Sequence, residues 1–417
     1  MEKLINIYWS KVNSFIGNTT SEMLGYNRPC PLCGSLDSKK VLELSDFQFY
    51  SDSTDIPKRF NVTENMCLRC FTLYLNPCYS SFGFRALFAD VGQSYGSMLK
   101  HTREQIDWLS NNELLNDGVR VFDIGCYDGY FLSCLPNNVI KLGVDIDKSS
   151  VERGRQRYKD KGIQFFLGDF ETFLFSGPAP DTITMYHVLE HLPRPVEVLR
   201  KLRSISKPTT GLVVEVPVIE NGKTNDINGF FSIQHMTHFS RNTLNNCFLQ
   251  AGWLVERCYE TPDYNGYRIL AYPQSEVPSD YPLKSAQEDW VELNSNLAAW
   301  HSAVEDVEII IQKIPKCNRI VIWGGGAHTE FLYQTTSLFH TRQQTEFIIV
   351  DSDPIKHKKT WRGIPIYDPC IIKGLDWSST NLLISSYGSQ EAITEAAVKL
   401  DVPTDNIISL YNTIRRY

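Results

Sequence analysis

Residues 121–129, VFDIGCYDG, constrain the fold more than any other stretch of this chain. The stretch opens with an apolar segment that suits a buried parallel strand. Gly125 and Gly129 then allow the backbone to turn tightly beside a ligand, before a helix that we expect to begin at Tyr130. A strand, a glycine turn and a helix in this order predict a nucleotide-type site in an α/β protein.

Two acidic residues downstream strengthen this interpretation, because a glycine turn also occurs in α/β proteins that bind nothing there. Residues 143–147 predict a second strand, and Asp145 at its end can accept hydrogen bonds from both hydroxyls of a ribose. Residues 163–167 predict a third strand. Asp169 follows it and can pair with an exocyclic amine, while the ring of Phe170 can cover a purine.

A fourth predicted strand, residues 182–186, leads into HVLEHL at residues 187–192. In this order the four segments resemble the class I S-adenosylmethionine-dependent methyltransferases. The turn departs from the dinucleotide fingerprint G-x-G-x-x-G, because Cys126 follows Gly125, and a sulfonium cofactor has no pyrophosphate to cradle. The resemblance implies that the cofactor is bound by Asp123, Gly125, Asp128, Gly129, Asp145, Asp169, Phe170 and His187.

Composition excludes several classes of partner. The 41 basic and 48 acidic residues give a net charge of -7, and no dense block of lysine and arginine could follow a nucleic acid backbone. No apolar run approaches the roughly 20 residues that a membrane span needs. The first 17 residues mix charged and apolar positions, unlike a signal peptide, and predict a short amphipathic helix. We therefore expect a cytoplasmic protein that binds neither nucleic acid nor membrane.

Two Cys-x-x-Cys pairs predict a metal site near the N-terminus. Cys30 with Cys33, and Cys67 with Cys70, can supply four thiolates to one tetrahedral Zn²⁺. Such a site has no open position, so this zinc would be structural. The gap between the pairs exceeds that of a compact zinc ribbon, which predicts strands inserted over residues 41–60. The alternative is four reduced thiols without a metal.

The other cysteines have no partner at ligand spacing, so we expect small, buried apolar side chains there. These cysteines are Cys78, Cys126, Cys134, Cys247, Cys258, Cys317 and Cys370.

Residues 94–101, SYGSMLKH, lie between the cysteine pairs and the glycine turn and narrow the resemblance. A zinc knuckle, this tyrosine- and serine-containing approach and a methyltransferase core together look like the nucleotide-sugar C-methyltransferases, which methylate C3 of keto-deoxysugars. That resemblance implies that Tyr95, Ser97 and His101 lie near cofactor and sugar.

Residues 225–240, NDINGFFSIQHMTHFS, correspond to a family segment that reads approximately Tyr-x-Glu-His before Phe-Ser. Aligned on the final Phe-Ser, the family histidine falls on His235, while Gln234 replaces the glutamate and Ser232 replaces the tyrosine. C-methylation needs a base beside a carbonyl, and an imidazole can serve near neutral pH. His235 is therefore the candidate base and His238 a second candidate. The alternative is that these histidines cap a helix or bind backbone carbonyls.

The rest of the chain predicts a second α/β unit. Residues 285–313 carry apolar side chains at helical spacing and predict a long amphipathic helix. Residues 319–323 then predict a strand, and three glycines at 324–326 a turn whose backbone N–H groups could bind an anion. The resemblance implies that this Rossmann-like unit helps to hold the nucleotide-sugar. The alternative is a nucleotide fold kept only for packing.

We therefore expect an α/β protein with a class I methyltransferase Rossmann-like core, a small zinc-binding domain before it and a second Rossmann-like domain after it. The leading function is C-methylation of a nucleotide-linked keto-deoxysugar with S-adenosylmethionine. One alternative is O- or N-methylation of a sugar or other small metabolite, and another is a non-catalytic cofactor-binding module. The expected boundaries are 1–78 for the helix and zinc domain, 79–275 for the methyltransferase domain, 276–315 for the linker helix and 316–417 for the last domain.

Overall fold

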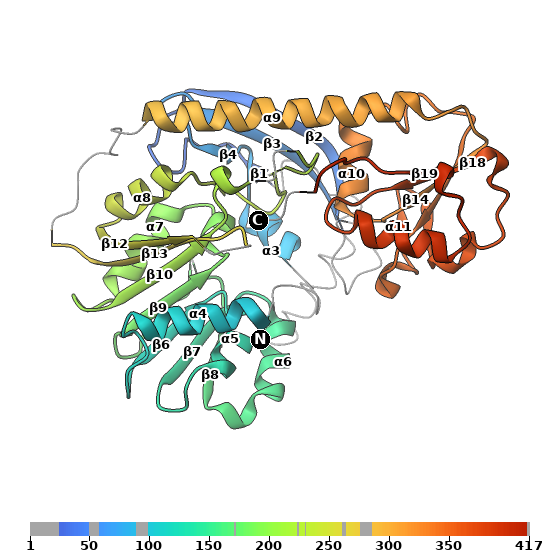
Figure 1. Ribbon diagram of the computed structural model, residues 1–417. Helices are drawn as coiled ribbons and strands as arrows, with labels where there is room; N and C mark the ends of the chain where they lie inside the picture. Colours follow the sequence, from blue (N-terminus) through green and yellow to red (C-terminus); the bar gives the residue numbers. More distant parts are fainter. Residues whose placement is uncertain are drawn as a thin grey trace.

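The computed structural model describes residues 25–49, 58–88, 99–170, 172–222, 225–229, 231–260, 264–275 and 286–414. These residues form a large mixed sheet, a smaller antiparallel sheet and the sheet of a second α/β unit. One long helix runs along all three (Figure 1). The helix expected over residues 1–17, together with Tyr95 and Ser97, lies outside the described residues. No helix of the described part is long and apolar enough to cross a membrane.

The large sheet has the strand order β12-β13-β10-β9-β6-β7-β8. Five strands run parallel, β13 is antiparallel to both of its neighbours, and numbering the seven along the chain gives the order 6-7-5-4-1-2-3. This confirms the class I methyltransferase core. The strands are β6 (Arg120–Ile124), β7 (Ile140–Asp145), β8 (Ile163–Leu167), β9 (Thr182–Tyr186), β10 (Gly211–Val216), β12 (Trp253–Glu260) and β13 (Tyr267–Pro273).

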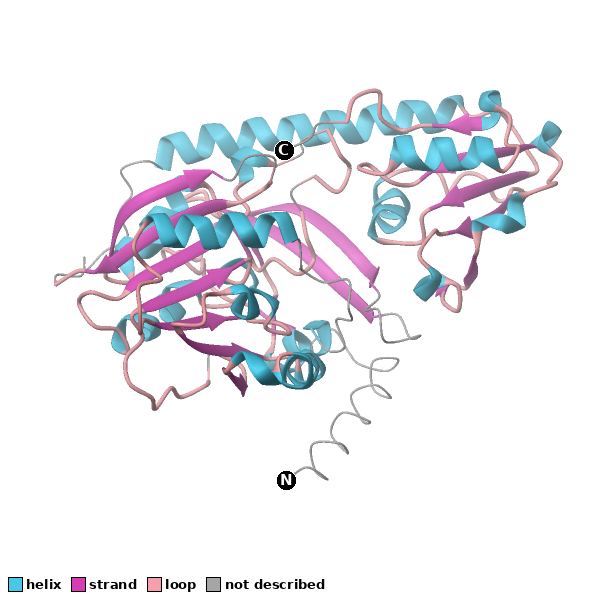
Figure 2. Ribbon diagram, turned by 60° about the horizontal axis from the view of Figure 1, so that its bottom comes forward, coloured by secondary structure: helices cyan, strands magenta, loops and turns pink. Residues whose placement is uncertain are grey.

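Helices cover both faces of this sheet (Figure 2). Local chemistry fixes where two of them begin, because Asp147 accepts a hydrogen bond from the Ser150 backbone N–H at the start of α6, and Ser240 and Thr243 form a capping box at the start of α8. The helices are α3 (Ser81–Phe88), α4 (Leu99–Asn111), α5 (Tyr130–Cys134), α6 (Lys148–Arg157), α7 (Pro195–Ser204) and α8 (Arg241–Gln250), with 3₁₀ turns η1 (Lys159–Lys161), η2 (Leu189–His191) and η3 (Ile219–Asn221).

The antiparallel sheet has the order β11-β4-β3-β2. Its long ribbon, β2 (Ser38–Phe49) and β3 (Lys58–Cys67), confirms the strands expected between the cysteine pairs. Beside it, β4 (Leu73–Leu75) pairs with β11 (Thr237–His238), which comes from the loop expected to hold the base. A separate pair joins β1 (Gly25–Tyr26) to β5 (Cys78–Tyr79). The cysteine-bearing sheet is thus completed by a strand from the core's own loop.

Helix α9 (Ala286–Lys313) confirms the long amphipathic helix and runs from the core to the second α/β unit (Figure 1). Its buried stripe includes Leu293, Trp300, Val307 and Ile311. The second unit has the sheet order β16-β17-β15-β14-β18-β19. Its elements are β14 (Arg319–Trp323), α10 (Ala327–Thr335), β15 (Glu346–Val350), η4 (Pro354–Lys356), β16 (Thr360–Trp361), β17 (Ile364–Tyr367), η5 (Pro369–Ile372), η6 (Trp377–Ser379), β18 (Thr380–Ile384), α11 (Gln390–Lys399), η7 (Thr404–Asn406) and β19 (Ile407–Ile408).

The glycine turn before α10 is already matched to a carboxylate of the chain itself. The Gly325 N–H donates to Asp351 Oδ2 at 2.7 Å, and Lys356 Nζ lies 3.0 Å from the same oxygen. One N–H of the turn is therefore used inside the chain, and Asp351 holds the turn against the end of β15.

The expectation for the unpaired cysteines was wrong in part. Cys134, Cys258 and Cys370 are exposed and Cys317 is half-buried, whereas Cys78, Cys126 and Cys247 are buried as expected. Spacing along the sequence carries no information about which of these small side chains the packing covers.

Candidate functional site

The glycine turn between β6 and α5 needs both of its glycines. Gly125 and Gly129 have φ angles of 73° and 78°, in the left-handed region where a side chain is strained. A Cβ on Gly125 would lie 2.3 Å from Val188 Cγ2, and one on Gly129 would lie 2.4 Å from Phe165 Cζ. Both contacts are too short for a side chain, so the turn needs glycine at these positions for its backbone angles and for its packing against Val188 and Phe165.

Asp145, at the end of β7, fixes this turn. Its Oδ2 accepts a hydrogen bond from the Tyr127 N–H at 2.8 Å, and its Oδ1 accepts one from the Asp147 N–H at 2.8 Å. Each carboxylate oxygen keeps a second lone pair for a ligand hydroxyl. Burial raises the pKa of Asp145 to about 6.

Asp123, at the neighbouring strand end, is buried beside Thr184, whose hydroxyl donates to Asp123 Oδ1 at 2.7 Å. Burial is the main cause that raises the pKa of Asp123 to about 7, and the charge of Asp145 adds to it. Two neighbouring carboxylates are therefore held with little positive charge to balance them.

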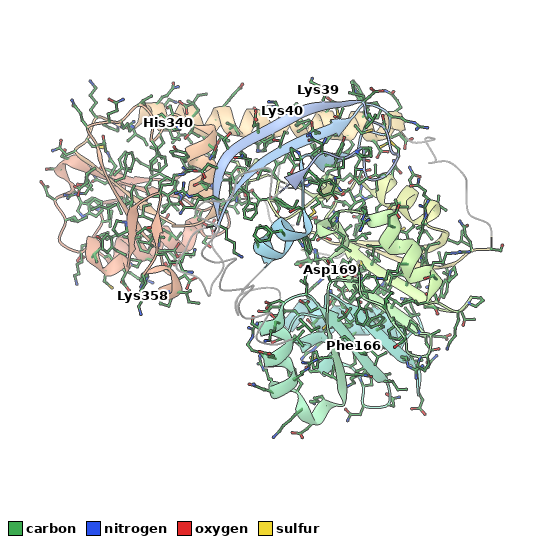
Figure 3. The ribbon with its side chains drawn as sticks, turned by 180° about the vertical axis from the view of Figure 1, so that it is seen from behind. Lys39, Lys40, Phe166, Asp169, His340 and Lys358 are labelled. Carbon is green, nitrogen blue, oxygen red and sulfur yellow. The ribbon has the colours of Figure 1, made fainter. Side chains whose placement is uncertain are left out.

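A cavity of about 250 Å³ opens at the carboxyl ends of the parallel strands. Every predicted cofactor residue except Gly129 lines it, and Figure 3 shows Asp169 at the edge of the core that faces α3. No lysine or arginine is among the described residues that line the cavity. Its carboxylates come from Asp123, Asp128, Asp145, Asp147 and Asp169. Such a cavity favours a cationic ligand and disfavours a dinucleotide, whose pyrophosphate is anionic.

Glu215, on β10, is a buried part of the site that the sequence interpretation did not name. Its Oε1 lies 2.7 Å from His101 Nε2, and its Oε2 accepts a hydrogen bond from Arg268 Nε at 2.7 Å. Burial raises the pKa of Glu215, but hydrogen bonds from His101 and His187 and the charge of Arg268 outweigh it, so the pKa lies well below its usual value. The available signal was a single charged residue in the otherwise apolar strand GLVVEV.

His187 sits between two carboxylates at the cavity wall. Its Nδ1 lies 3.5 Å from Glu190 Oε1 and its Nε2 lies 3.4 Å from Glu215 Oε1. Burial lowers the pKa of His187, but the two glutamates raise it to about 9. The ring of Tyr264 covers His101 at a centroid distance of 3.9 Å and meets His187 edge-on. His101 and Tyr264 both line the cavity.

The two candidate bases have different surroundings. His238 is buried on β11, with its Nε2 3.1 Å from Glu64 Oε1 on the cysteine-bearing sheet. His235 is half-buried, and its ring centroid lies 4.9 Å from that of His191, which lines the cavity. Burial and the neighbouring histidines hold the pKa of His235 well below its usual value. Neither His235 nor His238 lines the cavity itself, and Tyr95 lies outside the described residues.

The four predicted zinc ligands come together at the end of the β2–β3 ribbon. Cys30 Sγ lies 3.6 Å from Cys70 Sγ, and Cys33 Sγ lies 3.5 Å from Cys67 Sγ. These separations are far longer than a disulfide bond of about 2.05 Å. All four sulfurs lie within 4.8 Å of one another, which is compatible with one tetrahedral Zn²⁺.

Comparison with known proteins adds a family match. Residues 98–257 match a family model described as a methyltransferase domain. The ubiquinone biosynthesis O-methyltransferases of Aeromonas salmonicida (strain A449) and Stutzerimonas stutzeri (strain A1501) are each 24% identical to this chain over 108 residues. The match covers 25% of this chain and 45% and 46% of theirs, so it spans less than half of these relatives' length.

Solved methyltransferase structures are also similar to this chain. Magnesium protoporphyrin IX methyltransferase from Synechocystis PCC 6803 with bound SAH is 18% identical, with a TM-score of 0.36, over 42% of this chain and 83% of that one. An S-adenosylmethionine-dependent methyltransferase from Clostridium acetobutylicum ATCC 824 is 8% identical, with a TM-score of 0.36, over 44% of this chain and 94% of that one.

The strand order of the core, the acidic cavity at its carboxyl edge and the family match agree with one another. They show that residues 98–257 match a methyltransferase domain and that the core has the class I methyltransferase fold.

Proposed function

We propose that the chain transfers a methyl group from S-adenosylmethionine to a carbon atom of a nucleotide-linked keto-deoxysugar. Asp145 would hold the ribose hydroxyls, and Asp169 and Phe170 the adenine, with the glycine turn at Gly125 beside the cofactor. When bound, the cofactor supplies an electrophilic methyl group. The lack of lysine and arginine in the described cavity lining supports this proposal, because the sulfonium and ammonium of the cofactor outweigh its one carboxylate and leave a net positive charge.

We assign binding of the methyl acceptor to the loop over residues 225–238. Three other parts of the chain contact this loop and hold it in place. The cysteine-bearing sheet pairs with it through β11. The Trp300 indole of α9 donates to the Ile227 carbonyl at 2.8 Å. From the second α/β unit, the Tyr387 hydroxyl donates to Asn225 Oδ1 at 2.6 Å, and the Ile227 N–H donates to the Tyr411 hydroxyl at 3.3 Å. A loop held in this way keeps His235 beside the cavity-lining His191, which supports a role for the loop in binding the acceptor.

Within that loop we assign the ionisation of the acceptor carbon to His235, as the resemblance implies. His238 is held by Glu64, which favours a role for it in joining the loop to the cysteine-bearing sheet. We also propose that the chain divides at the expected boundaries, 1–78, 79–275, 276–315 and 316–417, and that the four cysteines hold a structural zinc.

A second candidate is methylation of an oxygen or nitrogen of a sugar or other small metabolite. Gln234 and Ser232 replace the glutamate and tyrosine of the resembled segment, which removes two groups suited to C-methylation. The curated relatives carry the name O-methyltransferase, and this points in the same direction.

The experiment that tests the proposal uses the full chain, isotopically labelled S-adenosylmethionine and a panel of nucleotide-linked keto-deoxysugars, with mass spectrometry of the products. C-methylation predicts one labelled methyl group per sugar. It also predicts that the carbon beside the carbonyl takes up deuterium from solvent when the methyl donor is absent. Transfer of the methyl group without that exchange would favour an oxygen or nitrogen acceptor, and no transfer to any sugar would contradict the proposal.

A further inference from the structure

Glu190, in turn η2, is a buried carboxylate without a hydrogen bond from any described residue. Its side chain is 1% exposed, and neither carboxylate oxygen accepts a hydrogen bond from a described residue. Two imidazole nitrogens lie near Oε1, His187 Nδ1 at 3.5 Å and His191 Nε2 at 3.7 Å. A buried carboxylate in such surroundings is stabilised by positive charge. His187, whose pKa the two glutamates raise to about 9, supplies part of it without a hydrogen bond, and a bound metal ion would supply more.

The orientation of His191 favours the metal ion. Its Nδ1 lies 2.9 Å from the Gln234 carbonyl oxygen, which can only accept, so Nδ1 carries the hydrogen. The lone pair of the neutral ring is then on Nε2, the nitrogen nearest to Glu190. Metal-binding histidines are held in this way, because a backbone carbonyl on one nitrogen fixes the tautomer and turns the other nitrogen towards the metal.

His235 completes the group from the other loop. One ligand atom each from Glu190, His191 and His235 lies within 4.8 Å of the other two. Glu190 and His191 belong to η2, and His235 belongs to the loop before β11. The two segments are joined by a hydrogen bond from the Met236 N–H to the Glu190 carbonyl at 2.8 Å. The three ligands are therefore held together by the backbone of two adjoining segments.

We propose that Glu190, His191 and His235 form a binding site for a divalent transition-metal ion, zinc being the best match to two imidazoles and one carboxylate. Three protein ligands of this kind are typical of catalytic rather than structural metal sites, because a position on the ion stays open for water or substrate. His191 also lines the cavity, so the ion would lie at its wall. The site is separate from the four cysteines.

Metal binding at these residues does not depend on the proposed function, but its catalytic use does. An ion at this place would hold an oxygen of the acceptor and draw electron density from it, which makes the neighbouring proton easier to remove. His235 would then be a ligand of the ion, and the proton would pass to a water molecule while the electron pair of the C–H bond stays on the acceptor as an enolate. This assignment makes turnover depend on the metal, whereas direct proton transfer by a free imidazole does not.

The test is a Co²⁺ titration of the full chain after its cysteine site has been filled with zinc, followed by visible absorption. We expect one equivalent of Co²⁺ to bind with ligand-field bands but without the sulfur-to-cobalt charge-transfer bands of a thiolate site. Glu190→Gln and His191→Gln should weaken Co²⁺ binding at least about tenfold. His301→Gln, which removes an exposed histidine of α9, should bind Co²⁺ as the wild type does.

Melting temperatures of the same variants show whether each one folds, and His235→Asn, at a half-buried position, supplies a third ligand variant if a buried one does not. Absence of a cobalt site outside the cysteines, or unchanged binding by all folded ligand variants, would overturn the proposal and leave Glu190 as an ion-pair partner of His187. Cobalt binding without methyl transfer to any keto-sugar would contradict only the proposed function.

Discussion

Glu215 accepts a hydrogen bond from Arg268 Nε at 2.7 Å, and neither side chain is exposed to solvent. The two residues stand opposite each other on the antiparallel strands β10 and β13. Arg268 also donates to both oxygens of Glu104 on α4, and Glu215 also contacts His101 of the same helix. This buried charge network joins the sheet to α4 directly beside the cavity.

Removing the cation from this network should destabilise the core strongly. Arg268→Met leaves Glu215 buried with fewer positive partners, and breaking a buried pair on one side costs about 3–5 kcal/mol. Thermal and denaturant unfolding measure the effect. The matched control is Arg319→Met, because Arg319 pairs with Glu346 at the surface, where a pair contributes about 1 kcal/mol or less. Equal effects of the two substitutions would contradict the role assigned to the buried network.

Asp145→Ala should weaken S-adenosylmethionine binding at least about tenfold. The variant loses an acceptor for the ribose hydroxyls, and a hydrogen bond to a charged group contributes about 1.5–3 kcal/mol. It also frees the Tyr127 N–H that Asp145 holds in the glycine turn. Titration calorimetry gives the affinity. Asp160→Ala, at an exposed position of η1, should leave it unchanged, and an unchanged affinity in Asp145→Ala itself would refute the assignment.

Cofactor affinity should fall as the pH is lowered from about 7 to about 5. In the free protein, burial raises the pKa of Asp123 to about 7 and that of Asp145 to about 6. A cationic cofactor favours the ionised carboxylates, so binding below these values must first release protons, which weakens affinity by up to about tenfold per pH unit for each proton. Above about pH 7 both groups are ionised and affinity should level off.

Calorimetry in buffers of different ionisation enthalpy detects the released protons directly. Asp123→Asn should remove the upper part of the pH dependence. An affinity that is constant over this range would show that these carboxylates do not respond to the cofactor.

Zinc should be bound by the four cysteines at one equivalent and should stabilise the antiparallel sheet. Titration of thiols with an organomercurial should release this zinc. Cys67→Ala should lack it and should unfold at a lower temperature, because the ligands would lose their common partner. Cys258→Ser, at an exposed cysteine, should release zinc as the wild type does. Release of the same zinc from Cys67→Ala would place the metal elsewhere.

Most of the core could be predicted from the sequence, because the apolar strands and the glycine turn are local patterns. The strands predicted at residues 163–167 and 182–186 begin and end at those residues in the structure. Gly125 and Gly129 are needed for both their φ angles and their lack of a Cβ, so the sequence signal and the structural reason coincide. The paired cysteines are similarly specific, because few other uses require two such spacings.

The charged network and the joining of loops could not be predicted, because they depend on residues far apart in the chain. Glu215 and Arg268 meet only when β10 and β13 pair. In the sequence each is a single charged residue in a predicted strand, with nothing to indicate its partner. Likewise, the pairing of β4 with β11 links residues on either side of the whole glycine-turn region. No local pattern indicates that His238 faces Glu64 whereas His235 faces His191.

His235→Asn should lower turnover by about 10² to 10⁴-fold, the size of a usual proton-transfer contribution, while cofactor affinity stays the same. The acceptor would lose either its base or a ligand of the ion that promotes its ionisation. The half-buried ring lies beside His191 at the cavity wall, and its loss removes the side chain to which we assign ionisation of the acceptor. Exchange of the acceptor's α-hydrogen with solvent deuterium should fall by a similar factor, because exchange and methyl transfer share that ionisation.

The matched comparison is His238→Asn, three residues further along the same loop. His238 contacts Glu64 and has no place in the group formed by Glu190, His191 and His235, so its loss should lower the melting temperature more than it lowers exchange. Turnover and exchange that both stay within a few fold in His235→Asn would make this histidine structural. Transfer to an oxygen or nitrogen acceptor would then become the better explanation, because neither needs a carbon-bound proton to leave.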